Sequence, residues 1–246
     1  MGSVKTSNSP EYRREANQEL LPVMKNTHVL SPREKVLKTL RIYRIVFEEL
    51  ARDKAARRGK STATTRVDHD TRAILVKEGM QVNGVSMIGQ VPGVEVGDEF
   101  QYKAELNLIG LHLNMAGGID YMGRGDKMLA TSIVASQDSG YSDRFESDFL
   151  IYSGEGGNVL GNRKLFDNQK MVRGNLALAN CIRVKSLVRV IRGLKRPDNK
   201  GKRYVYDGLY NVQEYGVENG PAGNAIFKFK LRRLPGQPSI CWKHFF

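Results

Sequence analysis

The sequence predicts an α+β fold in which helices flank a mostly antiparallel sheet that rolls up or closes on itself. Three observations favour this fold. A helical apolar period is confined to the residues before Val91. Short segments with the alternation typical of strands follow it. Glycine-rich turns separate these segments, whereas parallel strands would need helices of connecting length between them.

The first predicted element is a helix that begins at Ser31. Ser31 is a capping residue type, Pro32 suits the first helical position, and Glu34 completes a capping box. Apolar residues then recur at spacings of three and four: Val36, Leu40, Tyr43, Phe47 and Leu50. Such a stripe predicts packing against the rest of the protein. The helix is expected to stop near Gly59, and a shorter helix is expected over residues 70–78.

Six strands are predicted after these helices. The first is Phe100–Leu108, where apolar and polar residues alternate. The others cover residues 128–135, 148–152, 188–192, 205–215 and 225–231. We therefore divide the chain into three parts. Residues 1–30 form a flexible tail with a cloning remnant at its start, residues 31–84 a flanking helical segment, and residues 85–246 the core domain.

The net charge and its distribution along the chain indicate which kind of partner the protein binds. The 246 residues carry a formal net charge of +13, and 40% hydrophobic content is enough to build a core. No apolar run approaches the ~20 residues of a membrane helix, so no membrane partner is expected. Residues 163–203 hold thirteen Lys or Arg and two acids, whereas residues 95–155 hold eleven acids and four basic residues. This segregation favours a surface that meets phosphates over a merely solvated basic face.

The chain carries no motif of a familiar enzyme class. It lacks a Gly-x-x-x-x-Gly-Lys-Ser/Thr phosphate loop and a His-x-Glu motif followed by Cys-x-x-Cys. The four histidines are not at metal-ligand spacing, and the two cysteines are too few for a four-cysteine zinc site. We therefore expect no catalytic residue, no metal and no cofactor.

Seven motifs between residues 85 and 240 are more specific. They are Val91–Asp98, Gly118–Tyr121, Tyr152–Asn158, Arg173–Leu178, Val188–Gly193, Tyr206–Tyr210 and Phe229–Leu234. In this order they resemble the SRA (SET- and RING-associated, or YDG) domain, particularly its version in plant histone-lysine methyltransferases. The resemblance implies an SRA/PUA-like twisted β-barrel with helices packed on it. Its concave face would bind double-stranded DNA and hold a methylated cytosine turned out of the duplex.

The resemblance also implies which residues form the base pocket. Tyr141 and Tyr152 would sandwich the base, Asp143 would bond its polar edge, and nearby Ser153 and Gly154 would line the rest. A carboxylate accepts a hydrogen bond from the exocyclic amine of cytosine, whereas thymine presents a carbonyl there. Extrusion costs a few kcal/mol, which stacking and these contacts would offset.

The resemblance also concerns the residues before the pocket, the YDG motif and two loops. Residues 136–140 and the segment between the two tyrosines depart from the family pattern, so a neighbour such as Asp138, or backbone groups, is the alternative to Asp143 for the polar contact. Tyr206 and Asp207 lie within a predicted strand and are expected to support the fold. Two loops, residues 112–118 and 161–164, would approach the DNA grooves. Their proposed contact residues are Met115, Ala116, Asn162, Arg163 and Lys164.

The leading hypothesis is a non-catalytic reader of 5-methylcytosine in double-stranded DNA. Its parent protein would be a nuclear, chromatin-associated histone-lysine methyltransferase that the reader recruits to methylated chromatin. Two alternatives stay open: a DNA-binding scaffold without methyl selectivity, and a base-modifying enzyme.

Overall fold

The computed structural model describes residues 29–56, 66–136, 143–146, 148–157, 167–196, 201–220 and 223–242. Tyr141 and the proposed groove residues Asn162, Arg163 and Lys164 lie outside these ranges, as does the predicted stop at Gly59. Residues 32–246 group into one compact unit, and the fold described below is that of its described residues.

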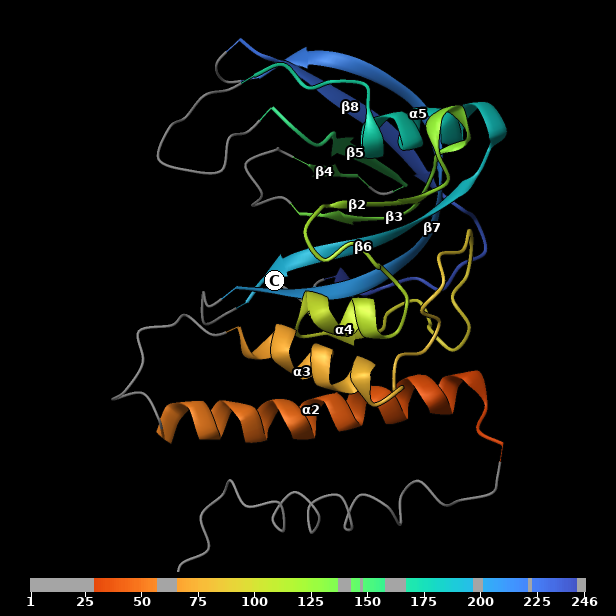
Figure 1. Ribbon diagram of the computed structural model, residues 1–246. Coiled ribbons are helices and arrows are strands. Elements are labelled where there is room, and N and C mark those ends of the chain that lie inside the picture. The colour runs from red at the N-terminus through yellow and green to blue at the C-terminus, as the bar shows by residue number, and fades with distance from the viewer. Residues whose placement is uncertain are drawn as a thin grey trace, which may run out of the picture. The chain divides into compact units, whose positions relative to one another are not determined.

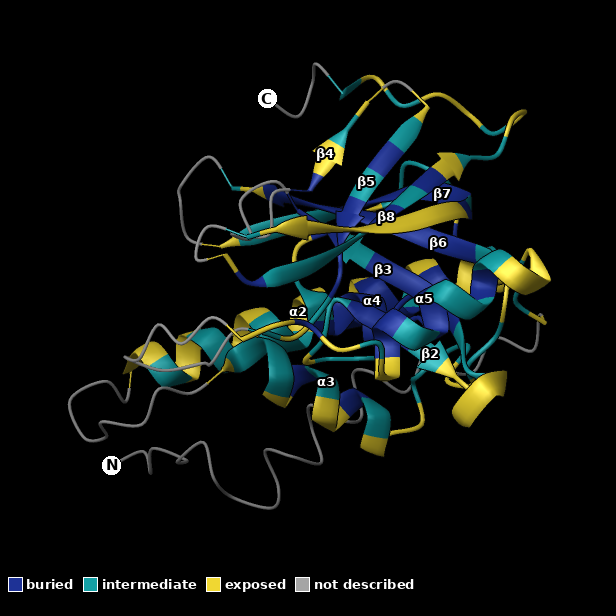
Figure 2. Ribbon diagram, turned by 90° about the horizontal axis from the view of Figure 1, so that it is seen from above, coloured by how far each residue is buried: buried dark blue, intermediate teal, exposed yellow. Residues whose placement is uncertain are grey.

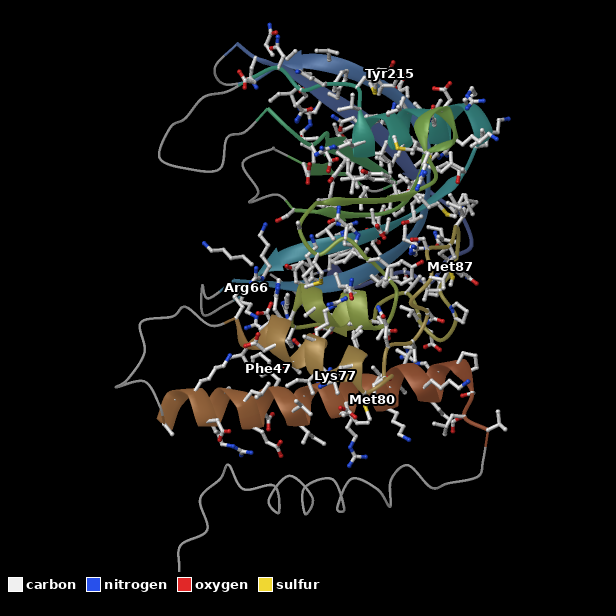
Figure 3. All side chains as sticks on the ribbon, in the orientation of Figure 1. Phe47, Arg66, Lys77, Met80, Met87 and Tyr215 are labelled. Carbon is white, nitrogen blue, oxygen red and sulfur yellow. The ribbon has the colours of Figure 1, made fainter. Side chains whose placement is uncertain are left out.

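Three helices stack on one side of the sheet (Figure 1). They are α2 (Pro32–Ala56), α3 (Val67–Lys77) and the short α4 (Lys103–Leu108). The helix predicted from Ser31 is confirmed, and the predicted stripe faces inward, with Val36 and Tyr43 fully buried. Phe47 lies on the side of α2 that faces α3 (Figure 3) and stacks on Tyr102 with ring centroids 4.5 Å apart. No described helix combines the length and the apolar composition needed to cross a lipid bilayer.

Eight strands form one sheet. They are β1 (Glu99–Phe100), β2 (Ile119–Met122), β3 (Leu129–Ala135), β4 (Arg144–Phe145), β5 (Phe149–Ser153), β6 (Leu187–Lys195), β7 (Lys202–Asn219) and β8 (Ala225–Arg233). Their order is β2-β3-β6-β7-β8-β5-β4, with β1 paired to β7. All these pairs are antiparallel except β3 with β6. The predicted α+β class is confirmed. Among the described residues the order has two ends, β2 and β4, so the barrel is a curled sheet that does not close.

Two predictions about local structure were wrong. Residues 103–108 form α4 and not a strand, because Glu105 caps the turn: its Oε2 accepts the backbone N–H groups of Gln101 and Tyr102 at 2.5 and 2.9 Å. Residues 104–111 are all buried, so no helical period shows in the sequence. The sequence reasoning also missed α5 (Arg173–Val184), which connects to β6.

Both faces of the central strands are covered (Figure 2). On β6, Val190 packs with α5 residues such as Leu178, while the next residue, Ile191, packs with Val36 and Leu40 of α2. Successive strand residues point to opposite faces, so this division places one core on each side of the sheet. The sheet is therefore a rigid support for the segments at its curled ends.

Candidate nucleic-acid interface

Asp143 lies where the two ends of the curled sheet meet. Its side chain is 5% exposed and directly precedes β4. Oδ2 accepts the backbone N–H of Ser136, just after β3, at 2.8 Å, and Oδ1 accepts the N–H of Ser153, the last residue of β5, at 2.9 Å. In the sheet, β6, β7 and β8 separate β3 from β5. One carboxylate thus joins two strands that meet because the sheet curls.

Two opposing electrostatic effects act on the pKa of Asp143. Burial raises the pKa of Asp143, while the N–H groups of Ser153 and Ser136 and the charge of Lys228 lower it. Each carboxylate oxygen can accept more than one hydrogen bond. Ionised Asp143 therefore keeps acceptor capacity for a donor on a ligand.

Tyr152 and Gly154 flank Ser153 and depend on close packing. Tyr152 is 5% exposed and belongs to the core under α5. A Cβ on Gly118 would lie only 2.8 Å from the Tyr152 hydroxyl, so only glycine fits at the end of the 112–118 loop. A Cβ on Gly154 would lie 2.6 Å from Oδ1 of Asn175, which accepts the N–H of Glu155. The structure therefore brings Asp143, Tyr152, Ser153 and Gly154 together.

The 112–118 loop is held by buried polar contacts. His112 is fully buried between Ser132 Oγ, at 2.8 Å from Nδ1, and the carbonyl of Gly117, at 3.1 Å from Nε2. Burial lowers the pKa of His112 to about 3, so the ring is neutral near pH 7. Ala116 is exposed at the tip, whereas Met115 is half-buried against the helical cluster around Tyr43. This position gives Met115 a packing role in the loop, and Ala116 the more open position.

A relay of amide and guanidinium groups connects this loop to the flanking helices. Arg72 of α3 donates from Nε to Oδ1 of Asn107 in α4 at 2.5 Å. Asn107 in turn donates from Nδ2 to the carbonyl of Leu113 at 2.6 Å. The helices before the sheet therefore help to set the position of the loop.

A cleft of about 710 Å³ opens between the 112–118 loop and the start of α5. Asn114, Ala116 and Gly117 line one side, and the other side includes Glu155, Asn168, Lys170 and Arg173. Lys170 and Arg173 are exposed, and the carboxylate of Glu155 accepts the N–H of Gly174 at 3.1 Å. The sequence did not single out Lys170 or Arg173 as DNA-contact residues, although both belong to the basic segment, residues 163–203.

Two arginines of the basic segment, residues 163–203, have structural partners instead of the phosphate-binding role expected of that segment. Arg189 is 1% exposed and donates to the carbonyl oxygens of Leu111, Met87 and Gly89 at 3.1, 2.8 and 2.8 Å. Met87 lies on the loop beside the sheet (Figure 3). Arg192 donates to the buried carboxylate of Asp207 at 2.5 Å. These two arginines hold the fold and do not face a polyanion.

Within the part of the chain that the structure describes, no three His, Cys, Asp or Glu residues gather in a way that would hold a metal ion. The site is instead a buried carboxylate, an aromatic ring and glycines, and the cleft nearby is lined by basic residues (Lys170, Arg173) and acidic residues (Glu155, Asp167). Such a set suits recognition of a polar, planar group that belongs to a polyanion.

Comparison with known proteins identifies the family. Residues 87–237 match the SAD/SRA domain, so the chain belongs to the SAD/SRA domain family. A YDG domain-containing protein of Arabidopsis thaliana is 53% identical over 228 residues, which cover 91% of this chain and 55% of that protein. The H3 lysine-9 specific histone-lysine N-methyltransferase SUVH5 of Arabidopsis thaliana is 47% identical over 224 residues, 87% of this chain and 28% of SUVH5.

A solved structure matches part of the chain. The SRA domain of SUVH5, crystallised in complex with fully methylated CG DNA, is 56% identical with a TM-score of 0.56. The match covers 63% of this chain and 99% of that domain. The chain spans only about half, or less, of the length of the two curated relatives described above.

Proposed function

We propose that this chain is a non-catalytic reader of 5-methylcytosine in double-stranded DNA and that it binds the methylated base after turning it out of the duplex. The observation that carries the proposal is the buried carboxylate of Asp143, which backbone N–H groups hold at the junction of β3 and β5. The 56% identity to a domain solved with fully methylated CG DNA supports the same conclusion.

The proposed mechanism begins with the cost of extrusion, which is a few kcal/mol. Stacking between the rings of Tyr141 and Tyr152 offsets that cost by ~1–3 kcal/mol per base–aromatic contact. Asp143 then accepts a hydrogen bond from the exocyclic amine of cytosine. Thymine offers a carbonyl at this position and repels the carboxylate. Ser153 and Gly154 line the rest of the pocket.

The DNA backbone is proposed to lie along the cleft beside this pocket. Ala116 and Met115 on one side, and Asn162, Arg163 and Lys164 on the other, approach the grooves. Exposed Lys170 and Arg173 add positive charge where phosphates pass. These contacts supply affinity without sequence information.

The wider role follows from the relatives. One relative is a histone-lysine N-methyltransferase, so we propose that the parent protein is a nuclear, chromatin-associated enzyme of this kind and that the reader recruits it to methylated chromatin. We further propose that residues 85–246 bind DNA and that residues 31–84 buttress them.

The test is a competition titration at fixed salt between duplexes that differ only in methylation of one cytosine. We expect the methylated duplex to bind about 10-fold tighter or more, since only its methylated base is proposed to fill the pocket, where stacking contributes ~1–3 kcal/mol per base. Equal affinities would contradict the proposal and favour a scaffold without methyl selectivity. Recovery of a chemically altered base, measured by mass spectrometry, would contradict it in favour of a base-modifying enzyme.

A further inference from the structure

Two lysines bracket the buried carboxylate in matching ways. The hydroxyl of Ser136 accepts a hydrogen bond from Nζ of Lys202 at 2.7 Å, and the hydroxyl of Ser153 accepts one from Nζ of Lys228 at 2.6 Å. These are the same two serines whose backbone N–H groups bond to Asp143. On each side of the carboxylate, a serine N–H group therefore bonds to it directly, and a lysine ammonium group bonds to the hydroxyl of the same serine.

The two lysines come from different strands, so the arrangement depends on the whole curled sheet. Lys202 is the first residue of β7. Lys228 lies in β8, directly opposite Ser153 of β5 in the strand register. They are separated from their serines by 66 and 75 residues in the chain. Both side chains are half-buried, which places positive charge close to the carboxylate without removing it fully from water.

We propose that Lys202 and Lys228 are positioning residues for the recognition of methylcytosine, and that they keep Asp143 oriented and negatively charged once a base fills the site. This inference rests on the proposed function. An entering base displaces water, which disfavours an ionised carboxylate, and the phosphates of the same strand add negative charge nearby. Both effects favour a protonated Asp143, which is a poorer acceptor. Two nearby ammonium groups oppose them.

The other charged groups around Asp143 do not provide this balance. Arg144 follows Asp143 but pairs with Glu218 at 3.5 Å on the exposed surface. Glu218 of β7 acts on the charge of Lys228. The charge of Lys228 acts directly on Asp143, and the ammonium group of Lys202 bonds to the hydroxyl of Ser136, whose N–H group contacts the carboxylate.

The chain offers a matched control in Lys230. It lies two residues beyond Lys228 on the same face of β8, and its ammonium group is 3.3 Å from Glu214 and 4.9 Å from the Phe149 ring centroid. Removal of Lys230 changes the net charge by the same amount as removal of Lys228 but leaves Ser153 and Asp143 untouched.

The experiment compares Lys202→Met, Lys228→Met, Lys228→Arg and Lys230→Met with the wild-type chain and Asp143→Asn. Thermal melting first establishes that each variant is folded. Affinities for methylated and unmethylated duplexes are then measured from pH 8 down to pH 5 at constant ionic strength. We expect Lys228→Met to reduce the methylated-to-unmethylated affinity ratio about 10-fold and Lys202→Met several-fold, in line with charge-assisted hydrogen bonds.

The pH profile gives a readout that a merely structural role would not change. Loss of an ammonium group makes Asp143 easier to protonate, so methyl preference should disappear at a higher pH in Lys228→Met than in wild type. Lys228→Arg keeps the positive charge, so it should retain the wild-type affinity ratio and the wild-type pH profile. Lys230→Met should weaken both duplexes alike and leave the ratio unchanged.

Two failures are distinguishable. If wild type prefers methylated DNA and Asp143→Asn loses that preference, but Lys228→Met behaves like Lys230→Met, the inference is overturned and the proposed function stands. If wild type and Asp143→Asn bind both duplexes equally, the proposed function itself is overturned.

Discussion

Two buried aspartates in this protein have opposite surroundings. Asp207 is 1% exposed and is bonded by charged or hydroxyl side chains: Arg192 Nε at 2.5 Å, Arg233 Nε at 3.4 Å and the Tyr210 hydroxyl at 2.8 Å. Asp143 is held by the backbone N–H groups of Ser136 and Ser153 and by the Ser153 hydroxyl, and the ammonium groups of two lysines bond to the hydroxyls of these serines. Asp207 lies in the middle of β7, and Asp143 lies where the sheet's ends meet.

The difference separates a carboxylate that holds the fold from one that can bind a ligand. Arg192 and Arg233 form ion pairs with Asp207 and cross-link β6, β7 and β8. Backbone N–H groups orient Asp143 but leave acceptor capacity on each oxygen. Tyr206 and Asp207, which name the YDG motif, thus support the fold as the sequence predicts, with Tyr206 3% exposed in the core that α2 covers.

The largest effect is expected from Asp207→Asn. Loss of one partner from a buried ion-pair cluster leaves Arg192 and Arg233 poorly compensated, and such losses cost about 3–5 kcal/mol. Urea unfolding should show this loss of stability, whereas Asp143→Asn should lose less than half as much. Equal losses in the two variants would remove the distinction between the two aspartates.

A second prediction concerns the effect of acid on the stability that buried His112 confers. The pKa of His112 is about 3 in the folded chain and near 6.5 when unfolded, because burial disfavours the charged ring. Between these values the unfolded chain binds the proton and the folded chain does not, so stability falls as pH decreases below 6.5. The loss should reach about 2.5 kcal/mol by pH 4.5.

The comparison with His112→Gln isolates that contribution. The acids Asp143, Glu105 and Glu155 have raised pKa values and therefore act in the opposite direction, favouring the folded chain as they protonate. Both proteins share these acids. Urea unfolding at several pH values should show a shallower acid loss in His112→Gln, and parallel curves would contradict the assignment.

A third prediction concerns stacking in the proposed pocket. Tyr152→Leu keeps apolar volume in the core but removes the aromatic face, so affinity for methylated DNA should fall by ~1–3 kcal/mol. Affinity for unmethylated DNA should change little if that duplex binds without extrusion. Titration of the folded variant with both duplexes measures the difference, and an unchanged preference would place the base elsewhere.

The smallest expected effect is that of Asn107→Asp. The variant keeps the acceptor for Arg72 but loses the donor to the Leu113 carbonyl, a change of about 1 kcal/mol. Because Leu113 belongs to the groove loop, binding of methylated DNA should weaken by a few-fold. Titration of a normally folded variant measures this effect, and an unchanged affinity would show that the relay does not position the loop.

Sequence reasoning predicted the parts of the fold that have a strong local signal. The capping residues and apolar stripe of α2 lie within one segment, and the long strands β6, β7 and β8 alternate or stay apolar over many residues. The short α4 shows no helical apolar period in the sequence because residues 104–108 are all buried, and β4 has only two residues. Local patterns are too short there to decide between helix and strand.

The surroundings of the site were harder to predict for a different reason. Tyr152, Ser153 and Gly154 are contiguous in a recognisable motif, so the resemblance located them. The lysines that bond to the two serines come from residues 66 and 75 positions away, and only the curl of the sheet brings them together. No sequence pattern within one strand contains that information.

The central claim, that Asp143 reads the amine of an extruded methylcytosine, is tested most directly by exchanging that amine for a carbonyl. Wild type and Asp143→Asn are titrated with two duplexes that carry either 5-methylcytosine or thymine opposite the same guanine. Wild type should prefer 5-methylcytosine, even though the mismatched thymine is easier to extrude, and Asp143→Asn should lose or reverse that preference. An identical preference in both proteins would contradict the claim.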